Sequence, residues 1–410
     1  MTVRCAIVPP TPVPYREPLF RSLHEREELD IRVIYQSAGQ PSWDVPPEWF
    51  PREHPYPALH LRSLQRRRAG RTPVLWPRGL ERALGTADPD CVVVSEYGAA
   101  SVRALNWCRR HKRAYVIFTE CTPGIDSMLP GWQLGLHRRL GRQADGLIAA
   151  SSAARARLLA FGVPDDRIAV ALQAADVEPF RTAVASWTLR NRAGAAEPAT
   201  GAPVRIISAG RLVPDKNFGM LIEAFAKAGL TSAQAQLEIA GTGFLDDQLK
   251  ELATRLGVPV RWHGHLPPEE LPDLYANADV YALISSYEPF GVAVREAAAA
   301  GLPIICTKTA GAAGDVAIDG RNALLVNPYD VNNISSAIER LVSDPDLRRQ
   351  MGDESRAIDL ETDGSEVDAF VQAVVRAAVH RGRARPPGDP HSNGKTPAGY
   401  RPSRAGSTSS

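Results

Sequence analysis

Short apolar runs and amphipathic segments alternate regularly in the C-terminal half of the chain. The apolar runs RIISAGRL (205–212), AQLEIAG (235–241) and DVYALISS (279–286) are typical of buried strands. Between them, NFGMLIEAFAKAG (217–229) and DDQLKELATRLG (246–257) have helical periodicity and end in glycine. Repeated strand–helix units with short connections predict a parallel sheet covered on both faces. We therefore expect a Rossmann-like domain in this half.

The N-terminal half has the same kind of pattern with less regularity. Its apolar, strand-like runs are CAIVPP, DIRVIYQ, CVVVSE, AYVIFTE and GLIAAS. Helical stretches such as EPLFRSLHERE and ASVRALNWCRRHK lie between them. We therefore expect a second Rossmann-like domain, which makes the predicted fold class α/β.

Composition shifts along the chain predict where the domains divide. Residues 190–203 are rich in Ala, Gly and Pro, which indicates a linker, and the last thirty residues have too few apolar groups to form a core. The predicted divisions are an N-terminal domain at 1–185, a linker at 186–203, a second domain at 204–363, a helix returning to the first domain at 364–380 and a disordered tail at 381–410.

Length and composition are consistent with this division. A chain of 410 residues exceeds one ordinary core, and its 44% hydrophobic and 23% charged residues are typical of a soluble protein. The five cysteines form no CxxC pair, which favours buried reduced thiols over disulfides or a metal site. The first apolar stretch is too short for a signal peptide and no run is long enough to span a bilayer, so we expect a cytoplasmic protein.

Positive charge is unevenly distributed although the net charge is only +2. Seven arginines lie between His60 and Arg82, accompanied by one acid, Glu81. A second basic cluster, LHRRLGR, occupies 136–142. Two interpretations remain open: a solvated helix face, or a surface that meets anionic lipid at the inner face of the membrane or an acidic acceptor.

The stretch YEPFGVAVRE at 287–296 carries two glutamates, Glu288 and Glu296, around a Pro-Phe-Gly. Proline and glycine are poor helix-interior residues, so a helix should begin after Gly291. The loop before it then lies at the carboxyl edge of a parallel sheet, where ligands bind. Both carboxylates are able to face one crevice there. The alternative is that Glu288 favours the helix N-terminus electrostatically and Glu296 is solvated.

Two cations follow the strand at 205–210, because the next loop reads RLVPDKN and holds Arg211 and Lys216. Cations beside the unpaired N–H groups of a helix N-terminus suit a diphosphate, although such a pair is also common in ordinary exposed loops. Combined with two carboxylates for hydroxyl groups, the crevice is suited to a sugar nucleotide.

Other motifs add less. GTGFLD at 241–246 lacks the third glycine of a dinucleotide fingerprint and is interpreted as a strand-to-helix turn near the diphosphate. His263 and His265 alternate on a strand, so we expect one to pack and the other to approach the nucleotide base. Neither these histidines nor the DPD triplets at 88–90 and 344–346, which are typical of turns, indicate a metal site.

Residues 205–355 resemble the donor-binding half of the retaining glycosyltransferases of family 4, which have the GT-B fold. The resemblance is carried by AGRLVPDKN, GTG, HGHLPPEELPDLYANADVYALISSYEPFGVAVREAAAAGLPII and GDVAIDGRNALLVNPYD. It implies two Rossmann-like domains facing across a cleft. In the EX7E motif of this family, the first glutamate, here Glu288, faces the donor sugar and the second, here Glu296, holds the ribose. The diphosphate-binding cations of the family fall on Arg211 and Lys216.

The same resemblance extends to further residues of the cleft. Gly210, Gly243 and His265 are expected donor contacts, together with the backbone amides of Phe290 and Gly291. In the N-terminal half, which is less similar, PPTPVPYREPLF stands in place of a glycine-rich loop. Its prolines remove backbone donors. Tyr15 and Arg16 either replace those donors, or the loop shapes the acceptor site. Glu120, in FTECTPG, is the expected acceptor-side polar group unless it is a loop carboxylate without a role.

The resemblance implies retaining transfer of a hexose from a UDP or GDP sugar, without metal or other cofactor, to a glycan, lipid-linked or small-molecule hydroxyl. Arg211, Lys216 and Glu288 are the expected catalytic residues, and nucleic acid is not an expected partner. One alternative is a sugar-nucleotide epimerase of the same fold. A second is a non-catalytic nucleotide-binding subunit.

Overall fold

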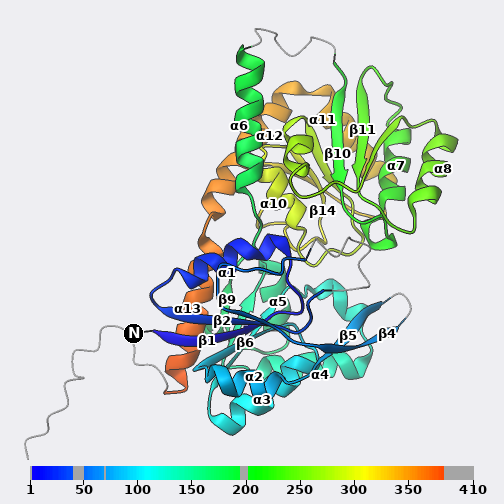
Figure 1. Cartoon of the computed structure of the whole chain (residues 1–410). Coiled ribbons are helices and arrows are strands. Elements are labelled where there is room, and N and C mark those ends of the chain that lie inside the picture. Colours follow the sequence, from blue (N-terminus) through cyan, green and yellow to red (C-terminus); the bar gives the residue numbers. More distant parts are fainter. Residues whose placement is uncertain (1, 40–49, 69–70, 194–201, 383–410) are drawn as a thin grey trace, which may run out of the picture.

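The N-terminal domain is built on one parallel sheet covered by helices (Figure 1). The computed structural model describes residues 2–39, 50–68, 71–193 and 202–382. Within them the sheet has the strand order β3-β2-β1-β6-β7-β8-β9. Its strands are β1 Val3–Val8, β2 Leu29–Tyr35, β3 Ala58–His60, β6 Cys91–Ser95, β7 Ala114–Thr119, β8 Gly146–Ala149 and β9 Ile168–Val170. The central strands β6, β7 and β8 are buried throughout, as expected for a parallel sheet between two helical layers.

Helices connect these strands and turn an apolar side to the sheet. They are α1 Glu17–His24, α2 Leu80–Ala87, α3 Ala99–His111, α4 Gly131–Gln143 and α5 Ser152–Ala160, with 3₁₀ turns η1 Pro14–Arg16, η3 Pro123–Ser127 and η4 Asp165–Arg167. In α1 the buried residues Leu19, Phe20 and Leu23 follow the spacing of one helical face. Alternation of strands and helices therefore confirms the α/β prediction for this half.

The second domain is also a parallel sheet with helical connections. Its strand order is β12-β11-β10-β13-β14-β15. The strands are β10 Val204–Ala209, β11 Ala235–Ala240, β12 Val260–Gly264, β13 Val280–Leu283, β14 Ile304–Thr307 and β15 Ala323–Val326. The helices are α7 Phe218–Lys227, α8 Asp246–Leu256, α9 Leu271–Ala276, α10 Val292–Ala299, α11 Val331–Ser343 and α12 Pro345–Thr362, with the 3₁₀ turn η5 Pro214–Lys216. Because β10 lies beside β13, the strand order reverses there, and the loops that follow these two strands border one crevice.

The chain crosses to the second domain just before helix α6, Glu178–Ala193, which packs against α9 and α10 of that domain. The predicted linker at 186–203 is therefore wrong over 186–193, which continue this helix, while 194–201 lie outside the described residues. The helix forms because its apolar residues have a surface to cover: Phe180 is buried and packs edge-on against Tyr275 of α9 at 5.0 Å between ring centroids. Composition alone did not reveal that surface.

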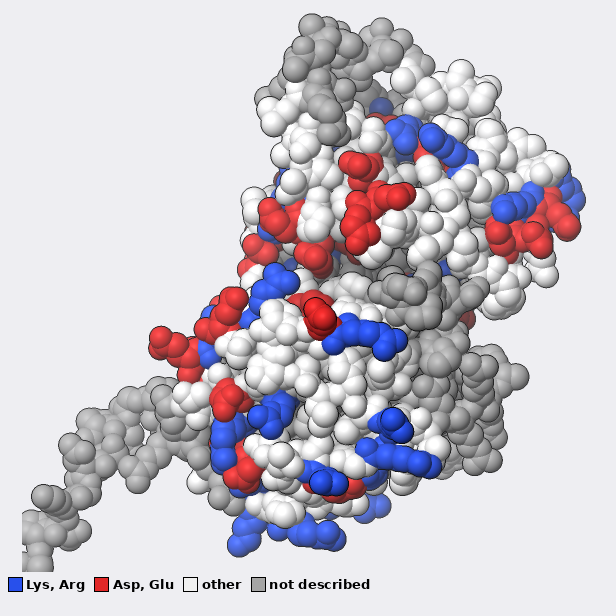
Figure 2. Space-filling model, viewed as in Figure 1, with Lys and Arg blue, Asp and Glu red and all other residues white. Residues whose placement is uncertain are grey.

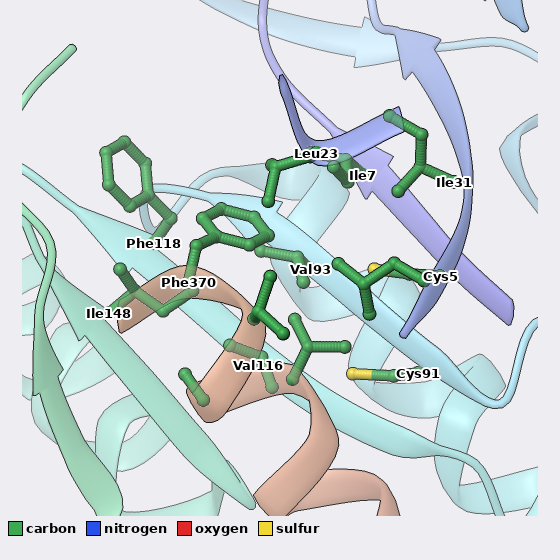
Figure 3. Close-up of a cluster of buried hydrophobic side chains, with 14 of the residues drawn as sticks. Cys5, Ile7, Leu23, Ile31, Cys91, Val93, Val116, Phe118, Ile148 and Phe370 are labelled. Atoms are coloured by element: carbon green, nitrogen blue, oxygen red, sulfur yellow. The ribbon is translucent and has the colours of Figure 1, made fainter. Parts of the chain in front are cut away.

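The chain returns to the first domain through helix α13, Ser365–His380, which packs against β7, β8 and β9. Figure 3 shows Phe370 of this helix among apolar side chains of the N-terminal sheet, including Val93, Val116 and Ile148. The N-terminal core is therefore completed by residues more than 200 positions later in the sequence. Of the predicted tail at 381–410, residues 383–410 lie outside the described residues.

The arginine-rich stretch before α2 is an antiparallel hairpin of β4 Ser63–Arg68 and β5 Arg71–Pro77. The interpretation of this stretch as a solvated helix face is therefore wrong. Leu64 and Trp76 are direct cross-strand neighbours in the hairpin and are both about half exposed. The side chains of residues 65–74, which include four of the seven arginines, lie outside the description.

Two further features of the described residues bear on the chemistry of the protein. All five cysteines are described and free, and four of them are buried. No helix in the described ranges is both long and apolar enough to cross a membrane.

Candidate active site

A cavity of about 520 Å³ lies between the two domains, at the carboxyl edges of β10, β11 and β13. Tyr15 and Glu120 line it from the N-terminal domain. The second domain supplies most of the wall, including Gly210, Arg211, Asp215, Lys216, Gly241, Thr242, His265, Leu266, Leu271, Tyr287, Glu288, Phe290, Gly291, Val292, Ala293 and Glu296. The structure thus brings the expected cations and both glutamates of YEPFGVAVRE together in one place.

Lys216 and Glu288 form an ion pair at the centre of this wall. Their side chains are 25% and 9% exposed, so the pair is reachable from the cavity but largely shielded from bulk water. Ser285 Oγ donates a further hydrogen bond of 3.2 Å to the Glu288 carboxylate. The Ser286 N–H donates to the carbonyl of Asp215 at 2.9 Å, which fastens the loop after β10 to the loop after β13. These contacts fix both charges in place.

Helix α10 begins at this wall, directly after Gly291. Gly291 has φ +97°, a backbone conformation that residues with a Cβ rarely adopt, which explains glycine at this position. As N-cap it has no side chain to accept from the first-turn N–H groups, and the first-turn residues Val292 and Ala293 line the cavity. The positive end of the helix dipole therefore faces the space beside Lys216 and favours an anion there.

Glu296 lies one turn further along α10 and accepts a hydrogen bond of 3.2 Å from the Tyr275 hydroxyl. Desolvation at the cavity wall raises the pKa of the Glu296 carboxyl to about 7, although the Tyr275 hydrogen bond opposes this. The negative charge of Asp176, on the segment that leads into α6, raises it slightly further. The carboxyl group therefore gains or loses its proton near neutrality.

The raised pKa of Glu296 predicts a pH-dependent contribution to stability. The native state holds this proton more tightly than the unfolded chain, so the contribution is full below the unfolded pKa of 4.5 and is lost as pH rises through about 7. Glu296→Gln should remove this loss. The melting temperature should therefore fall less between pH 4.5 and pH 8.5 in Glu296→Gln than in the wild type, by ~2–4 °C. Melting curves of both proteins at several pH values test this, and a constant difference between them contradicts it.

Part of the cavity wall carries larger apolar side chains. His265, Leu266 and Leu271 line it. The other histidine of the strand, His263, is held at 2.7 Å from the carboxylate of the buried Glu238, which also accepts a hydrogen bond from Arg205. Of the two alternating histidines, His263 therefore packs within the sheet and His265 reaches the cavity.

Tyr15, Arg16 and Glu120, the residues expected on the acceptor side, differ in how they lie relative to the cavity. Tyr15 lines the cavity. Arg16 does not line it; it pairs with Glu120, which does, and its guanidinium carbon lies 5.5 Å from the centre of the Phe118 ring. Burial raises the pKa of the Tyr15 phenol to about 12; Arg16 opposes the rise, and Glu120 and Glu288 add to it. Tyr15 thus lies near carboxylates of both domains.

Gly243 and Arg16 are the two expected site residues that do not line the cavity. A Cβ on Gly243 would lie 2.4 Å from the carbonyl oxygen of Leu212, so this glycine allows the two loops to pack against each other. Both residues contact residues next to or on the cavity wall without lining it: Gly243 packs against Leu212, and Arg16 pairs with Glu120.

Sequence reasoning missed Glu96, which holds the loop that carries Glu120. Its carboxylate accepts hydrogen bonds from the Glu120 N–H at 2.6 Å, the Thr119 hydroxyl at 3.0 Å and the Cys121 thiol at 3.0 Å. Its φ of +63° is rare for a residue with a side chain, and burial raises the pKa of its carboxyl. The signal in the sequence was the position of Glu96, an acidic residue directly after the strand CVVVS.

The described residues contain no group of three or more His, Cys, Asp or Glu side chains placed to hold a metal ion. The cavity offers a lysine, an arginine and a helix N-terminus for an anion, and carboxylates, among them Glu288 and Glu296, for hydroxyl groups. This combination fits a phosphorylated, hydroxyl-rich ligand.

Two family models match the chain and together cover most of it. The model described as "Glycosyl transferases group 1" matches residues 194–358, and that described as "Glycosyltransferase Family 4" matches residues 20–178. The two matches correspond closely to the second and the first domain.

Curated relatives give a similar result. The chain is 30% identical over 286 residues to the GDP-mannose-dependent alpha-(1-6)-phosphatidylinositol monomannoside mannosyltransferase of Mycolicibacterium smegmatis, which covers 67% of this chain and 72% of that protein. It is also 30% identical over 251 residues to the glycogen synthase of Mycobacterium tuberculosis, a match that spans 60% of this chain but only 57% of the relative.

Solved structures share the fold. The Anabaena protein HepE, solved in complex with UDP, superposes with a TM-score of 0.70 over 92% of this chain and 100% of that chain, at 18% identity. Sucrose-phosphate synthase from Thermosynechococcus elongatus gives a TM-score of 0.65 over 93% of this chain and 98% of its own, also at 18% identity. At this level of identity the likeness establishes the fold and nothing about the reaction.

Proposed function

Because the chain belongs to the glycosyltransferases of family 4, with the GT-B fold, we propose that it transfers a hexosyl group from a nucleoside-diphosphate sugar to a hydroxyl acceptor, with retention of the anomeric configuration. The observation that carries the proposal is the Lys216–Glu288 ion pair beside the N-terminus of α10, in a cavity lined by both domains. It places charge for a diphosphate next to a carboxylate for a sugar.

The proposed reaction breaks the bond between the sugar C1 and the diphosphate oxygen and forms a bond from C1 to the acceptor oxygen on the same face. The acceptor proton passes to the departing diphosphate. Negative charge grows on the diphosphate in the transition state, where Arg211, Lys216 and the N-terminal end of α10 stabilise it more than in the ground state.

Glu288 and Glu296 have separate roles in this proposal. Glu288, beside Lys216, accepts hydrogen bonds from the sugar hydroxyls, and Glu296 accepts from the ribose. His265, Leu266 and Leu271 then lie against the base. Tyr15 and Glu120 face the acceptor from the other domain.

The proposed donor is a UDP or GDP sugar, and the acceptor is a glycan, a lipid-linked sugar or a small molecule. Support for both nucleotides comes from relatives, since HepE was solved with UDP and the Mycolicibacterium smegmatis enzyme is named for its use of GDP-mannose.

The proposal is tested by incubating the protein with UDP and GDP sugars, with and without mixed acceptors and a metal chelator. We expect one sugar nucleotide to protect the protein against thermal unfolding and to release its nucleotide faster when an acceptor is present. An epimer formed from donor alone would favour the epimerase alternative. Protection without any turnover across acceptor classes would favour a non-catalytic subunit.

We also propose that the β4–β5 hairpin makes a peripheral contact with an anionic membrane. The exposed Leu64 and Trp76 lie side by side on it, and the guanidinium carbon of Arg103 lies 5.3 Å from the centre of the Trp76 ring. Exposed Arg62 and Arg78 flank the pair in sequence. Lysine and arginine side chains also gather along the lower edge of this domain (Figure 2). An apolar pair framed by cations is the pattern of an interfacial contact.

Vesicle binding tests the membrane contact. Binding to phosphatidylglycerol vesicles should be strong at 0.01 M salt, where the Debye length is about 30 Å, and weak at 1 M, where it is about 3 Å. Replacing Leu64 and Trp76 together by serine should weaken binding about tenfold or more. Phe244→Ser, at a still more exposed aromatic in the other domain, is the control. Equal binding to neutral and anionic vesicles contradicts the proposal.

A further inference from the structure

Asp315 of the second domain caps a helix of the first. Its carboxylate accepts the backbone N–H of Ser152 at 2.7 Å and the Ser152 hydroxyl at 2.5 Å. Ser152 is the first residue of α5, and Ser151 caps the same helix from within its own domain by accepting the Ala154 N–H. A carboxylate at a helix N-terminus is stabilised by the unpaired N–H groups and by the helix dipole. This contact therefore joins the two domains by a charged, directional bond.

On its own side, Asp315 is tied to the sugar-facing loop. The segment just before it donates two backbone hydrogen bonds to that loop, from Gly311 N to Glu288 O at 3.1 Å and from Ala312 N to Phe290 O at 2.8 Å. The Asp315 and Val316 amides then bond back to the Ala312 carbonyl at 3.3 and 2.9 Å. The position of Asp315 is thus fixed relative to Glu288.

On the other side, α5 is tied to η3, the turn that closely follows Glu120 in the chain. Its buried Arg157 donates to Asp126 of η3 at 2.7 Å. The same 3₁₀ turn contains Gly124, where a Cβ would lie 3.7 Å from Cδ2 of Tyr287, the residue that precedes Glu288. Contacts therefore run from the sugar-facing loop through Asp315, α5 and η3, and return to Tyr287 beside that loop.

We propose that Asp315 is a positioning residue for the transfer reaction. By capping α5 across the cleft, it sets the distance between the N-terminal wall, with Tyr15 and Glu120, and the donor wall, with Lys216 and Glu288. Asp315 is not among the residues that line the cavity. This inference rests on the proposed function, because the two walls are taken to hold acceptor and donor.

Loss of the bond between Asp315 and Ser152 should affect transfer but not donor binding. The donor nucleotide is held by the second domain, so its binding does not need the interdomain bond. Transfer does need it, since a misplacement of about 1 Å between reacting groups lowers a rate by as much as about 100-fold.

The test compares Asp315→Ala, Asp315→Asn and Ser152→Ala in the full-length chain. We expect Asp315→Ala to lower kcat/KM for the acceptor by about 10- to 100-fold, while the Kd for UDP or GDP changes less than twofold. Asp315→Asn keeps one acceptor oxygen and should recover part of the rate. Ser152→Ala loses the hydroxyl but keeps the backbone bond and should be milder. The Asp315→Ala/Ser152→Ala double variant should be no worse than Asp315→Ala.

Asp319→Ala is the matched control, because Asp319 is exposed near the same loop and accepts only from Leu325 N–H in its own domain among the hydrogen bonds described. Small-angle scattering provides a readout independent of turnover: Asp315→Ala should increase the radius of gyration and the control should not. If Asp315→Ala changes neither the scattering nor the transfer rate, the inference is wrong. It is also wrong if Asp315→Ala lowers nucleotide affinity as much as it lowers the transfer rate. A wild type that binds no nucleotide sugar refutes the proposed function, while the scattering result still tests the interdomain bond.

Discussion

Lys216→Ala is expected to lower the rate of sugar transfer by ~10²–10³-fold, which corresponds to ~2.7–4 kcal/mol of lost transition-state stabilisation. Lys216 is the cation that the structure places directly against Glu288, beside the N-terminus of α10. Its removal takes away positive charge where the proposed reaction builds negative charge. It also leaves the largely buried Glu288 carboxylate without its counterion next to the diphosphate. Transfer rates and calorimetric binding of the nucleoside diphosphate measure both effects.

Two further variants separate these effects. Lys216→Ala combined with Glu288→Gln removes the unpaired carboxylate, so it should bind the nucleoside diphosphate more tightly than Lys216→Ala alone. Lys250→Ala, at an exposed lysine paired with Asp246 on α8, is the control and should change neither rate nor affinity. Normal turnover by Lys216→Ala would place the leaving-group stabilisation elsewhere and would remove the main support for the proposed site.

Glu288→Ala is expected to reduce turnover by ~10² or more while sparing the binding of free nucleoside diphosphate. In the proposed site this carboxylate contacts the sugar, which the free diphosphate lacks. The Lys216 ammonium, released from its partner, becomes available to the diphosphate, so affinity should stay the same or increase. Glu288→Gln should be milder if hydrogen bonding dominates and as severe if the negative charge is what matters.

Glu296→Ala provides the contrast, because the ribose is common to the donor and to the free nucleoside diphosphate. This variant should weaken the binding of both. Calorimetry and transfer rates of the Glu288 and Glu296 variants, with folding checked by melting, distinguish the two roles. Should both alanine variants bind and turn over normally, neither glutamate contacts the donor and the cavity is not the donor site.

The sequence by itself determined the fold class and most of the second-domain wall of the cavity. Strand, loop and helix alternate locally within some twenty to forty residues, so apolar periodicity and helix-stop glycines carry that information along the chain. The spacing around Gly291 placed Glu288 in the loop and Glu296 on α10, as the structure has them. Arg211 and Lys216 were likewise found on the loop after β10, because a parallel sheet brings such loops to one edge.

Tertiary structure alone decided features that depend on contacts distant in sequence. Composition predicted a linker over residues whose helix, α6, is stabilised by covering α9 and α10. An arginine count did not distinguish a helix face from the β4–β5 hairpin, since strand pairing depends on the partner strand. Tyr15 and Arg16 were equivalent candidates from the sequence, and only the structure places Tyr15 on the cavity wall and pairs Arg16 with Glu120, 104 residues away.

The interdomain bond between Asp315 and Ser152 is the clearest case, because 163 positions separate the two residues and neither lies in a pattern that marks the other. Helix periodicity identifies the start of α5 but not what caps it from outside. The local sequence pattern therefore established the two domains and the sheet edge at which the loops of each domain gather. The packing of the domains against each other decided which side chains meet across the cleft, because such contacts depend on the three-dimensional arrangement of the whole chain.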